Sequence, residues 1–143
     1  MVDAYAGDVT ATTCCDMLRE DAGAYLVDVR TRAEWTYVGF PLLPDGRAPL
    51  FQEWQSFPSM SVDPDFAATL AGRIADAGGT PASKVYFLCR SGVRSIASAK
   101  ALAAAGYQHC YNVLDGFEGS PDGEGHRGTQ AGWKAEGLPW AQR

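Results

Sequence analysis

Cys89 is the residue best placed to do chemistry in this sequence, because of what lies on either side of it. It follows the apolar run 85–88, which predicts a buried strand, and precedes the polar loop 90–94. Ala-rich helical sequence then begins at Ser95. A cysteine between a strand and a helix N-terminus meets converging backbone N–H groups and the positive end of the helix dipole. This pattern, with two arginines in the loop, predicts a thiolate nucleophile that acts on a small anion.

The elements that must position this cysteine alternate along the chain. The apolar run 25–29 is typical of a strand in a parallel sheet that is covered on both faces. We expect strands over residues 8–9, 25–29, 48–51, 85–88 and 110–114, helices over 13–20, 63–77, 95–105 and 129–136, and a helical turn over 31–35. The pattern predicts a doubly wound α/β fold with a mostly parallel sheet of about five strands and helices on both faces. Cys89 then falls beyond the carboxyl end of a strand, where such sheets bind ligands.

Composition limits the classes of function. A chain of 143 residues with 46% hydrophobic residues is expected to form one domain over residues 1–143. No run reaches the ~18 apolar residues of a membrane helix. The first residues lack a basic segment followed by an apolar core, so we expect a cytoplasmic protein. The net charge of −5 argues against a nucleic-acid partner, which would need a basic face.

The other cysteines are expected to pack in the protein rather than to react. Cys14 and Cys15 fall in predicted helix and Cys110 in predicted strand. A resolving thiol at Cys14 or Cys15 that closes on Cys89 remains an alternative. The sequence has no Cys-x-x-Cys and only two histidines, so we expect neither a metal site nor a cofactor.

Three further residues are candidates for supporting the reactive loop. Asp28 and Arg30 stand at the end of the second strand, where they would either face the same crevice or form a structural salt bridge that orients the loop. In another arrangement, one loop arginine pairs inward with Asp28. Trp54 either lines the pocket or packs in the core.

The loop from Cys89 to Ser95 resembles the active-site loop of rhodanese-type sulfurtransferases. Further segments resemble the same family, namely 26–31, Glu34-Trp35 followed by Gly39, 106–107, 111–113, 116–117 and 132–140. The resemblance covers nearly the whole chain and implies one rhodanese-like domain. It implies that Cys89 is the catalytic nucleophile and that the substrate is bound by Arg90, Ser91, Gly92, Val93, Arg94 and Ser95.

The resemblance also implies an activity. Sulfane sulfur would pass from thiosulfate or a persulfide donor to cyanide or a thiol, through a persulfide on Cys89. The partners would be a small anionic sulfur donor or a sulfur-relay protein. Arg90 and Arg94 are expected to hold the anionic donor, since a guanidinium matches an oxyanion.

Alternatives and departures stay open. Thiolate phosphatases and arsenate reductases have five residues between cysteine and arginine, whereas this loop has the four residues 90–93, and a non-enzymatic binding module is a third class. The segment 118–131 is an insertion between two motifs. It is either a solvated Gly-rich loop or a lid or docking loop, in which case His126 and Arg127 would contact the substrate.

Overall fold

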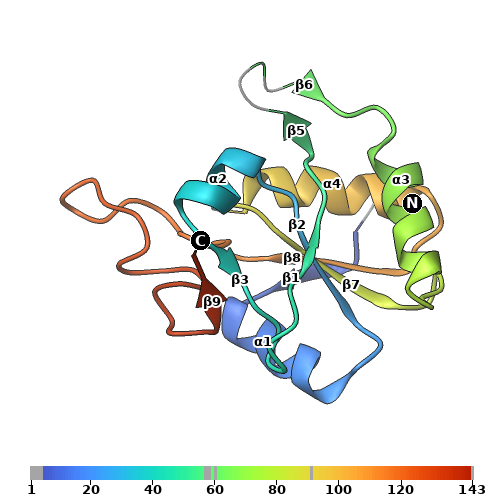
Figure 1. Cartoon of the computed structure of the whole chain (residues 1–143), viewed down its shortest axis with the longest axis horizontal. Helices are drawn as coiled ribbons and strands as arrows, with labels where there is room; N and C mark the ends of the chain where they lie inside the picture. Colours follow the sequence, from blue (N-terminus) through green and yellow to red (C-terminus); the bar gives the residue numbers. More distant parts are fainter. Residues whose placement is uncertain (1–4, 57–58, 60, 91, 143) are drawn as a thin grey trace.

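The computed structural model describes residues 5–56, 59, 61–90 and 92–142 and contains a five-stranded sheet with helices on both sides (Figure 1). Every neighbouring pair of strands in this sheet is parallel. The strands lie in the order β1 (Gly7–Val9), β8 (His109–Val113), β7 (Lys84–Leu88), β2 (Tyr25–Asp28) and β4 (Leu50–Phe51). The predicted α/β class and parallel sheet are therefore confirmed.

Helices cover the two faces unequally. Helix α1 (Ala11–Glu20) packs on one face, while α3 (Phe66–Asp76) and α4 (Val93–Ala104) pack on the other. Side chains of β7 alternate between the two layers, as the pleat requires. Tyr86 and Leu88 join the core beside α1, and Val85 and Phe87 join the core beside α3 and α4.

Two helices begin two residues earlier than predicted. The side chain of Thr10 accepts a hydrogen bond from the Thr13 N–H and caps α1, which therefore starts at Ala11. Helix α4 starts at Val93 because Gly92, with a φ of 104°, makes the left-handed turn that precedes it. This earlier start puts the end of the cysteine loop into the first turn of α4.

Shorter elements extend the fold beyond the main sheet. Helix α2 (Arg32–Tyr37) follows β2 and begins with the capping box of Thr31 and Glu34. Strand β3 (Phe40–Pro41) pairs antiparallel with β9 (Trp140–Ala141), and β5 (Gln55–Ser56) pairs with β6 (Ser61–Val62). The first ribbon brings the C-terminal segment against the chain that follows α2 (Figure 1).

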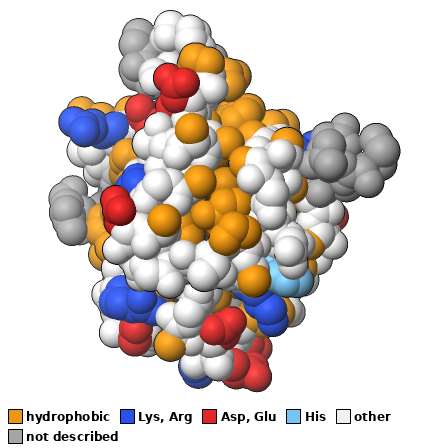
Figure 2. All heavy atoms as spheres, turned by 90° about the vertical axis from the view of Figure 1, so that its right-hand side faces the viewer, with side chains coloured by type: hydrophobic (Ala, Val, Ile, Leu, Met, Phe, Trp, Pro, Cys, Tyr) orange, Lys and Arg blue, Asp and Glu red, His pale blue; other side chains and the backbone are white. Residues whose placement is uncertain are grey.

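The solvent side of α3 carries small apolar side chains. Figure 2 views the molecule from the side where α3 lies in Figure 1, and apolar side chains gather near the middle of this face. Ala68 and Ala75 of α3 are exposed, whereas Phe66, Leu70 and Ile74 are buried.

No helix in the described part of the chain is long and apolar enough to cross a membrane.

The predicted helix over residues 129–136 is wrong, because this segment forms a series of turns. Gly132 has a φ of 95°, which interrupts helical geometry. Its backbone also lies against other segments, since a Cβ there would be 2.9 Å from Gly119 N and 3.0 Å from Gly116 O. The turns bury Trp133 completely, and its backbone N–H donates to the Gly116 carbonyl at 2.8 Å.

Replacing Gly132 with alanine tests this correction. Gly132→Ala should lower the free energy of unfolding by about 1–3 kcal/mol, because the residue needs a left-handed backbone and has no room for a Cβ. In a helix the same change would stabilise the protein by about 0.5–1 kcal/mol. Urea unfolding measures the difference, with Gly123→Ala as the control in open space. A stabilised Gly132→Ala protein would contradict the turn structure.

Candidate active site

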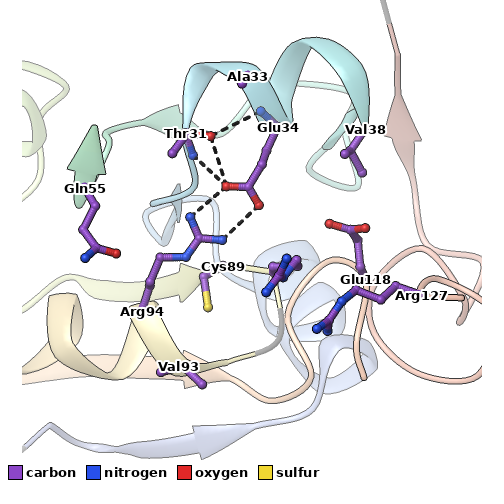
Figure 3. Close-up of a pocket in the computed structure, with 11 residues that line it drawn as sticks. Thr31, Ala33, Glu34, Val38, Gln55, Cys89, Val93, Arg94, Glu118 and Arg127 are labelled. Carbon is purple, nitrogen blue, oxygen red and sulfur yellow. Dashed lines mark hydrogen bonds and ion pairs between the residues drawn. The ribbon is translucent and has the colours of Figure 1, made fainter. Parts of the chain in front are cut away.

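A cleft of about 650 Å³ opens beyond the carboxyl end of β7, with Cys89 in its lining (Figure 3). One side of the cleft comes from α2 and the start of α4. The other side comes from the chain that follows β8. Its described lining residues are Thr31, Ala33, Glu34, Val38, Gln55, Cys89, Arg90, Val93, Arg94, Glu118 and Arg127.

The Cys89 sulfur lies against the start of α4. The Gly92 N–H donates to Cys89 Sγ at 3.1 Å, and Ser95 Oγ lies 3.3 Å from the same sulfur. Cys89 is only 1% exposed, so its sulfur is shielded on every side but the cleft. A thiolate there would be held by the fixed Gly92 N–H rather than by water.

A chain of polar groups behind Ser95 fixes its orientation. The Ser95 hydroxyl donates to Asn112 Oδ1, and Asn112 Nδ2 donates to Asp8 Oδ1 at 3.0 Å. The Asp8 carboxylate can only accept, so it sets which end of the Asn112 amide faces Ser95. Ser95 and Asn112 are buried, and the hydroxyl beside Cys89 is therefore held by a defined network.

The cysteine loop is clamped by the segment that follows β8. The Phe117 N–H donates to the Cys89 carbonyl at 2.8 Å, and the N–H groups of Glu118 and Gly119 donate to the Arg90 carbonyl at 3.0 and 3.1 Å. Gly116 permits this approach, because a Cβ at that position would overlap the Cys89 carbonyl oxygen. These bonds place Glu118 beside the loop that carries the sulfur.

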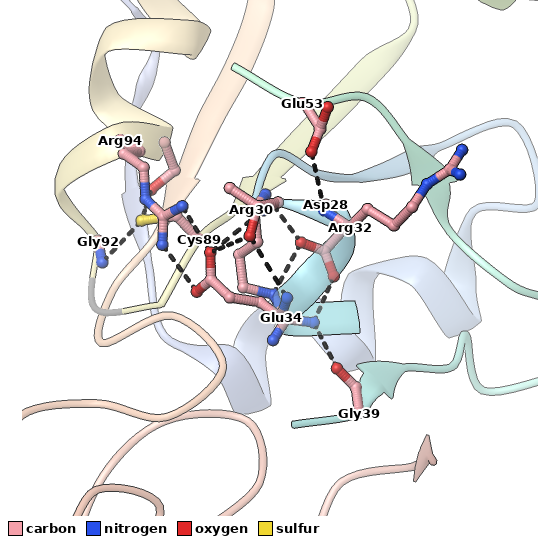
Figure 4. Close-up of polar contacts among 11 residues, drawn as sticks. Asp28, Arg30, Arg32, Glu34, Gly39, Glu53, Cys89, Gly92 and Arg94 are labelled. Carbon is pink, nitrogen blue, oxygen red and sulfur yellow. Dashed lines mark hydrogen bonds and ion pairs between the residues drawn. The ribbon is translucent and has the colours of Figure 1, made fainter. Parts of the chain in front are cut away.

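Arg94 is engaged by Glu34 instead of standing free for an anion. Its Nη1 and Nη2 donate to Glu34 Oε1 and Oε2 at 2.7 and 2.9 Å, a bidentate pair (Figures 3 and 4). Burial would raise the pKa of Glu34, but the hydrogen bonds and charge of Arg94 outweigh it and hold that pKa below its usual range. The pairing also fixes the N-terminus of α2, since Glu34 belongs to the capping box with Thr31.

Asp28 and Arg30 form a fully buried salt bridge behind the loop (Figure 4). Arg30 Nη2 donates to Asp28 Oδ2 and to the Gly39 carbonyl, each at 2.7 Å. The guanidinium also lies 4.4 Å from the centre of the Phe117 ring. Of the sequence alternatives, the structure thus has the salt bridge with Arg30, and Asp28 pairs with neither described loop arginine.

The remaining residues predicted for the site are not all in the cleft. Val93 is 75% exposed, and Arg90 is also exposed while lining the cleft. Trp54 is half-buried, packs edge-to-face on Phe66 at 5.1 Å and is not among the described lining residues. Ser91 lies outside the described residues.

The insertion 118–131 contributes residues to the cleft, as expected from the lid alternative of the sequence analysis. Arg127 lines the cleft, whereas His126 is absent from its described lining. The loop tip is organised by Asp122, whose carboxylate accepts from the Thr129 hydroxyl and from the His126 N–H. The Thr129 hydrogen bond and then the backbone N–H groups hold the pKa of Asp122 below its usual range.

The three cysteines outside the cleft are poor nucleophiles. All are buried free thiols. Burial, reinforced by Cys15, raises the pKa of Cys14 well above its usual range, and burial raises the pKa of Cys110 to about 12. Burial likewise raises the pKa of Cys15. A thiolate is therefore disfavoured at each of these positions.

Sequence and structure comparisons find related proteins over nearly the whole chain. The family model described as Rhodanese-like domain matches residues 10–120. A Rickettsia rickettsii protein, the RP600 homolog, is 38% identical over 133 residues, which cover 93% of this chain and 95% of that protein.

Solved structures are also similar to this one. The crystal structure of Rv0390 from M. tuberculosis has a TM-score of 0.84 and 46% identity, covering 97% of this chain and 99% of that chain. The polysulfide-sulfur transferase homodimer of Wolinella succinogenes has a TM-score of 0.59 and 21% identity, covering 99% of this chain and 80% of that chain. At 21% identity, the similarity to the Wolinella succinogenes structure shows a shared fold and no more.

Breaking the buried salt bridge should destabilise the protein strongly. Arg30→Met leaves the Asp28 carboxylate buried without its cation and should cost about 3–5 kcal/mol of unfolding free energy in urea titrations. Asp28→Asn in the Arg30→Met background should recover part of this loss, because it removes the unpaired charge. The exposed Arg32→Met is the control. An Arg30→Met protein as stable as this control would refute the supporting role.

The Glu34–Arg94 pair should make stability depend on pH. The folded pKa of Glu34 is lowered, so the stabilisation is complete above the unfolded value of about 4.3 and is lost as pH falls through the lower folded value. Glu34→Gln should be less stable than the wild type by about 1.5–3 kcal/mol at pH 7, and the gap should shrink below about pH 4. Urea unfolding between pH 7 and 3 measures it, with the exposed Glu20→Gln as control. A gap that widens on acidification would contradict the assignment.

Proposed function

Because this chain belongs to the rhodanese-like domain family, we propose that it is a sulfurtransferase that carries sulfane sulfur as a persulfide on Cys89. The observation that carries this proposal is the position of Cys89. Its sulfur faces a cleft that contains arginines and accepts the Gly92 N–H at the start of α4. The polysulfide-sulfur transferase of Wolinella succinogenes shares the fold, and its name is consistent with this class of chemistry.

The first half of the reaction loads the cysteine. The Cys89 thiolate attacks the outer sulfur of thiosulfate, and a new S–S bond forms while the bond from that sulfur to the sulfonate breaks. Sulfite leaves with the electron pair, so the charge of −3 on the reactants is conserved as one persulfide anion and one sulfite dianion. A persulfide on a small molecule or a sulfur-relay protein would donate in the same way, with a thiolate as the leaving group.

The second half returns the cysteine to its starting state. Cyanide or a thiolate attacks the outer sulfur of the persulfide, and the electron pair of the broken S–S bond returns to Cys89 Sγ. No oxidant or reductant is consumed, because the sulfane sulfur moves without changing its oxidation state. The Gly92 N–H lies where it would stabilise the departing thiolate, whereas the Ser95 hydroxyl donates its proton to Asn112.

The arginines of the loop take different roles in this proposal. Arg90 lines the cleft and is exposed, so it attracts the anionic donor. Arg94 acts mainly as a positioning residue, because both of its terminal nitrogens bond to Glu34.

We place the reaction in the cytoplasm, where the four free thiols would stay reduced.

Two other classes of function are less well supported. A thiolate phosphatase would need an arginine that clasps the phosphate, and the Arg94 fork is occupied by Glu34. A binding module without activity would have no use for a cysteine sulfur held by a backbone N–H inside an arginine-lined cleft.

The proposal predicts that Cys89→Ser abolishes turnover of thiosulfate and cyanide, because an alkoxide cannot form under conditions that give a thiolate. Production of thiocyanate should fall by at least about 10³-fold, as for loss of a covalent nucleophile. In the wild type, initial rates should follow ping-pong kinetics.

Cys15→Ser provides the matched control, since it makes the same atomic change at a buried cysteine outside the cleft. It should retain turnover close to that of the wild type. Turnover that survives in Cys89→Ser and disappears in Cys15→Ser would move the chemistry to α1 and refute the proposal.

A further inference from the structure

The cleft contains charges of both signs that the cysteine loop does not explain. Arg127 and Glu118 reach it from the insertion 118–131, on the other side of Cys89 from the Arg94–Glu34 pair in Figure 3. Neither residue belongs to the loop that holds the sulfur. A ligand that contacts them would extend past the reacting sulfur.

The positions of these two residues are tied to the nucleophile. The Glu118 N–H donates to the Arg90 carbonyl at 3.0 Å, and the Glu118 carbonyl accepts the Gly128 N–H at 2.7 Å. Arg127 Nη1 donates to the Gly119 carbonyl at 2.6 Å, which anchors one corner of the guanidinium. Glu118 and Arg127 are therefore linked to the cysteine loop through short backbone contacts.

The charge balance distinguishes this side of the cleft from the other. Glu34 neutralises Arg94, whereas the Glu118 carboxylate has no ion pair or side-chain hydrogen bond within the described residues. A carboxylate there repels thiosulfate and an anionic persulfide. A ligand with a cationic group would pair with this carboxylate, while Arg127 and Arg90 suit a ligand carboxylate.

The size of the cleft agrees with an organic ligand. Its volume of about 650 Å³ lies within the range of small-molecule sites, roughly 300–1,000 Å³. Cyanide and thiosulfate have only a few non-hydrogen atoms and would fill a small part of it. An organic thiol with charged groups would use more of this volume and could contact Arg127 as well as Cys89.

We propose that the sulfur acceptor is a small thiol of the amino-acid type, whose carboxylate binds Arg127 and whose ammonium group binds Glu118. This inference rests on the proposed sulfurtransferase function and deepens it. The acceptor thiolate attacks the outer sulfur of the Cys89 persulfide, forms a new S–S bond and leaves as an organic persulfide. The electron pair of the broken bond stays on Cys89 Sγ, so no further reactant is needed.

Four acceptors separate the contributions of the two charges. L-Cysteine carries both groups, 3-mercaptopropionate only the carboxylate, cysteamine only the ammonium group, and cyanide neither. The protein is loaded with sulfane sulfur from thiosulfate or polysulfide, the donor is removed, and the rate of persulfide loss is followed with each acceptor. Each variant is compared with the wild type for the same acceptor, which cancels differences in intrinsic nucleophilicity.

Arg127→Met should lower kcat/KM about tenfold for L-cysteine and 3-mercaptopropionate, the loss expected for one charge-assisted contact. Glu118→Gln should lower it about tenfold for L-cysteine and cysteamine. Cyanide makes neither contact, so the change in its rate reports only the altered charge of the cleft and should stay well below tenfold in both variants. Arg127→Lys keeps the charge and should retain part of the selectivity.

Glu124→Gln is the matched control, because it removes an exposed carboxylate of the same insertion outside the described lining. It should leave all four acceptors unchanged. Arg127 and Glu118 variants that alter all four acceptors by one common factor, or alter none, would overturn the acceptor assignment. Failure of the loaded wild type to pass sulfur even to cyanide would instead overturn the sulfurtransferase proposal beneath it.

Discussion

The backbone hydrogen bonds between the cysteine loop and the segment after β8 are the constraint on which the site depends. The carbonyls of Cys89 and Arg90 accept the N–H groups of residues 117–119, so both are satisfied by the segment after β8. Gly116 makes this possible, since any Cβ there would overlap the Cys89 carbonyl oxygen. Because these contacts involve only backbone, they hold the loop in one conformation whatever the charge on the sulfur.

Charge pairing within the protein decides which groups remain for ligands. Arg30 and Arg94 are each paired with a carboxylate, Arg30 in the core and Arg94 at the edge of the cleft. The first pair supports Phe117, and through its N–H the Cys89 carbonyl, while the second joins α4 to α2. Both terminal nitrogens of Arg94 are therefore occupied, and a count of arginines in the loop overstates the positive charge that the cleft offers to an anion.

Local sequence signals were sufficient to predict the sheet and the place of Cys89 at the end of a strand. The apolar run before Cys89 and the Ala-rich helix after it define a strand–loop–helix unit without knowledge of the rest of the chain. The Glu34–Arg94 pair was missed because its partners are far apart in sequence, although the capping box around Glu34 is readable. The last helix was predicted wrongly because Gly132 takes a left-handed conformation that closes on Gly119, a tertiary contact that outweighs local propensity.

The mass of the intact protein after brief incubation with thiosulfate tests the central claim, a persulfide on Cys89, most directly. Wild type and Cys89→Ser are measured side by side, before and after cyanide is added. We expect the wild type to gain the mass of one sulfur atom and to lose it again with cyanide, while the variant gains nothing. An equal gain in the variant would contradict Cys89 as the carrier, and no gain in the wild type with either thiosulfate or polysulfide would contradict the persulfide mechanism.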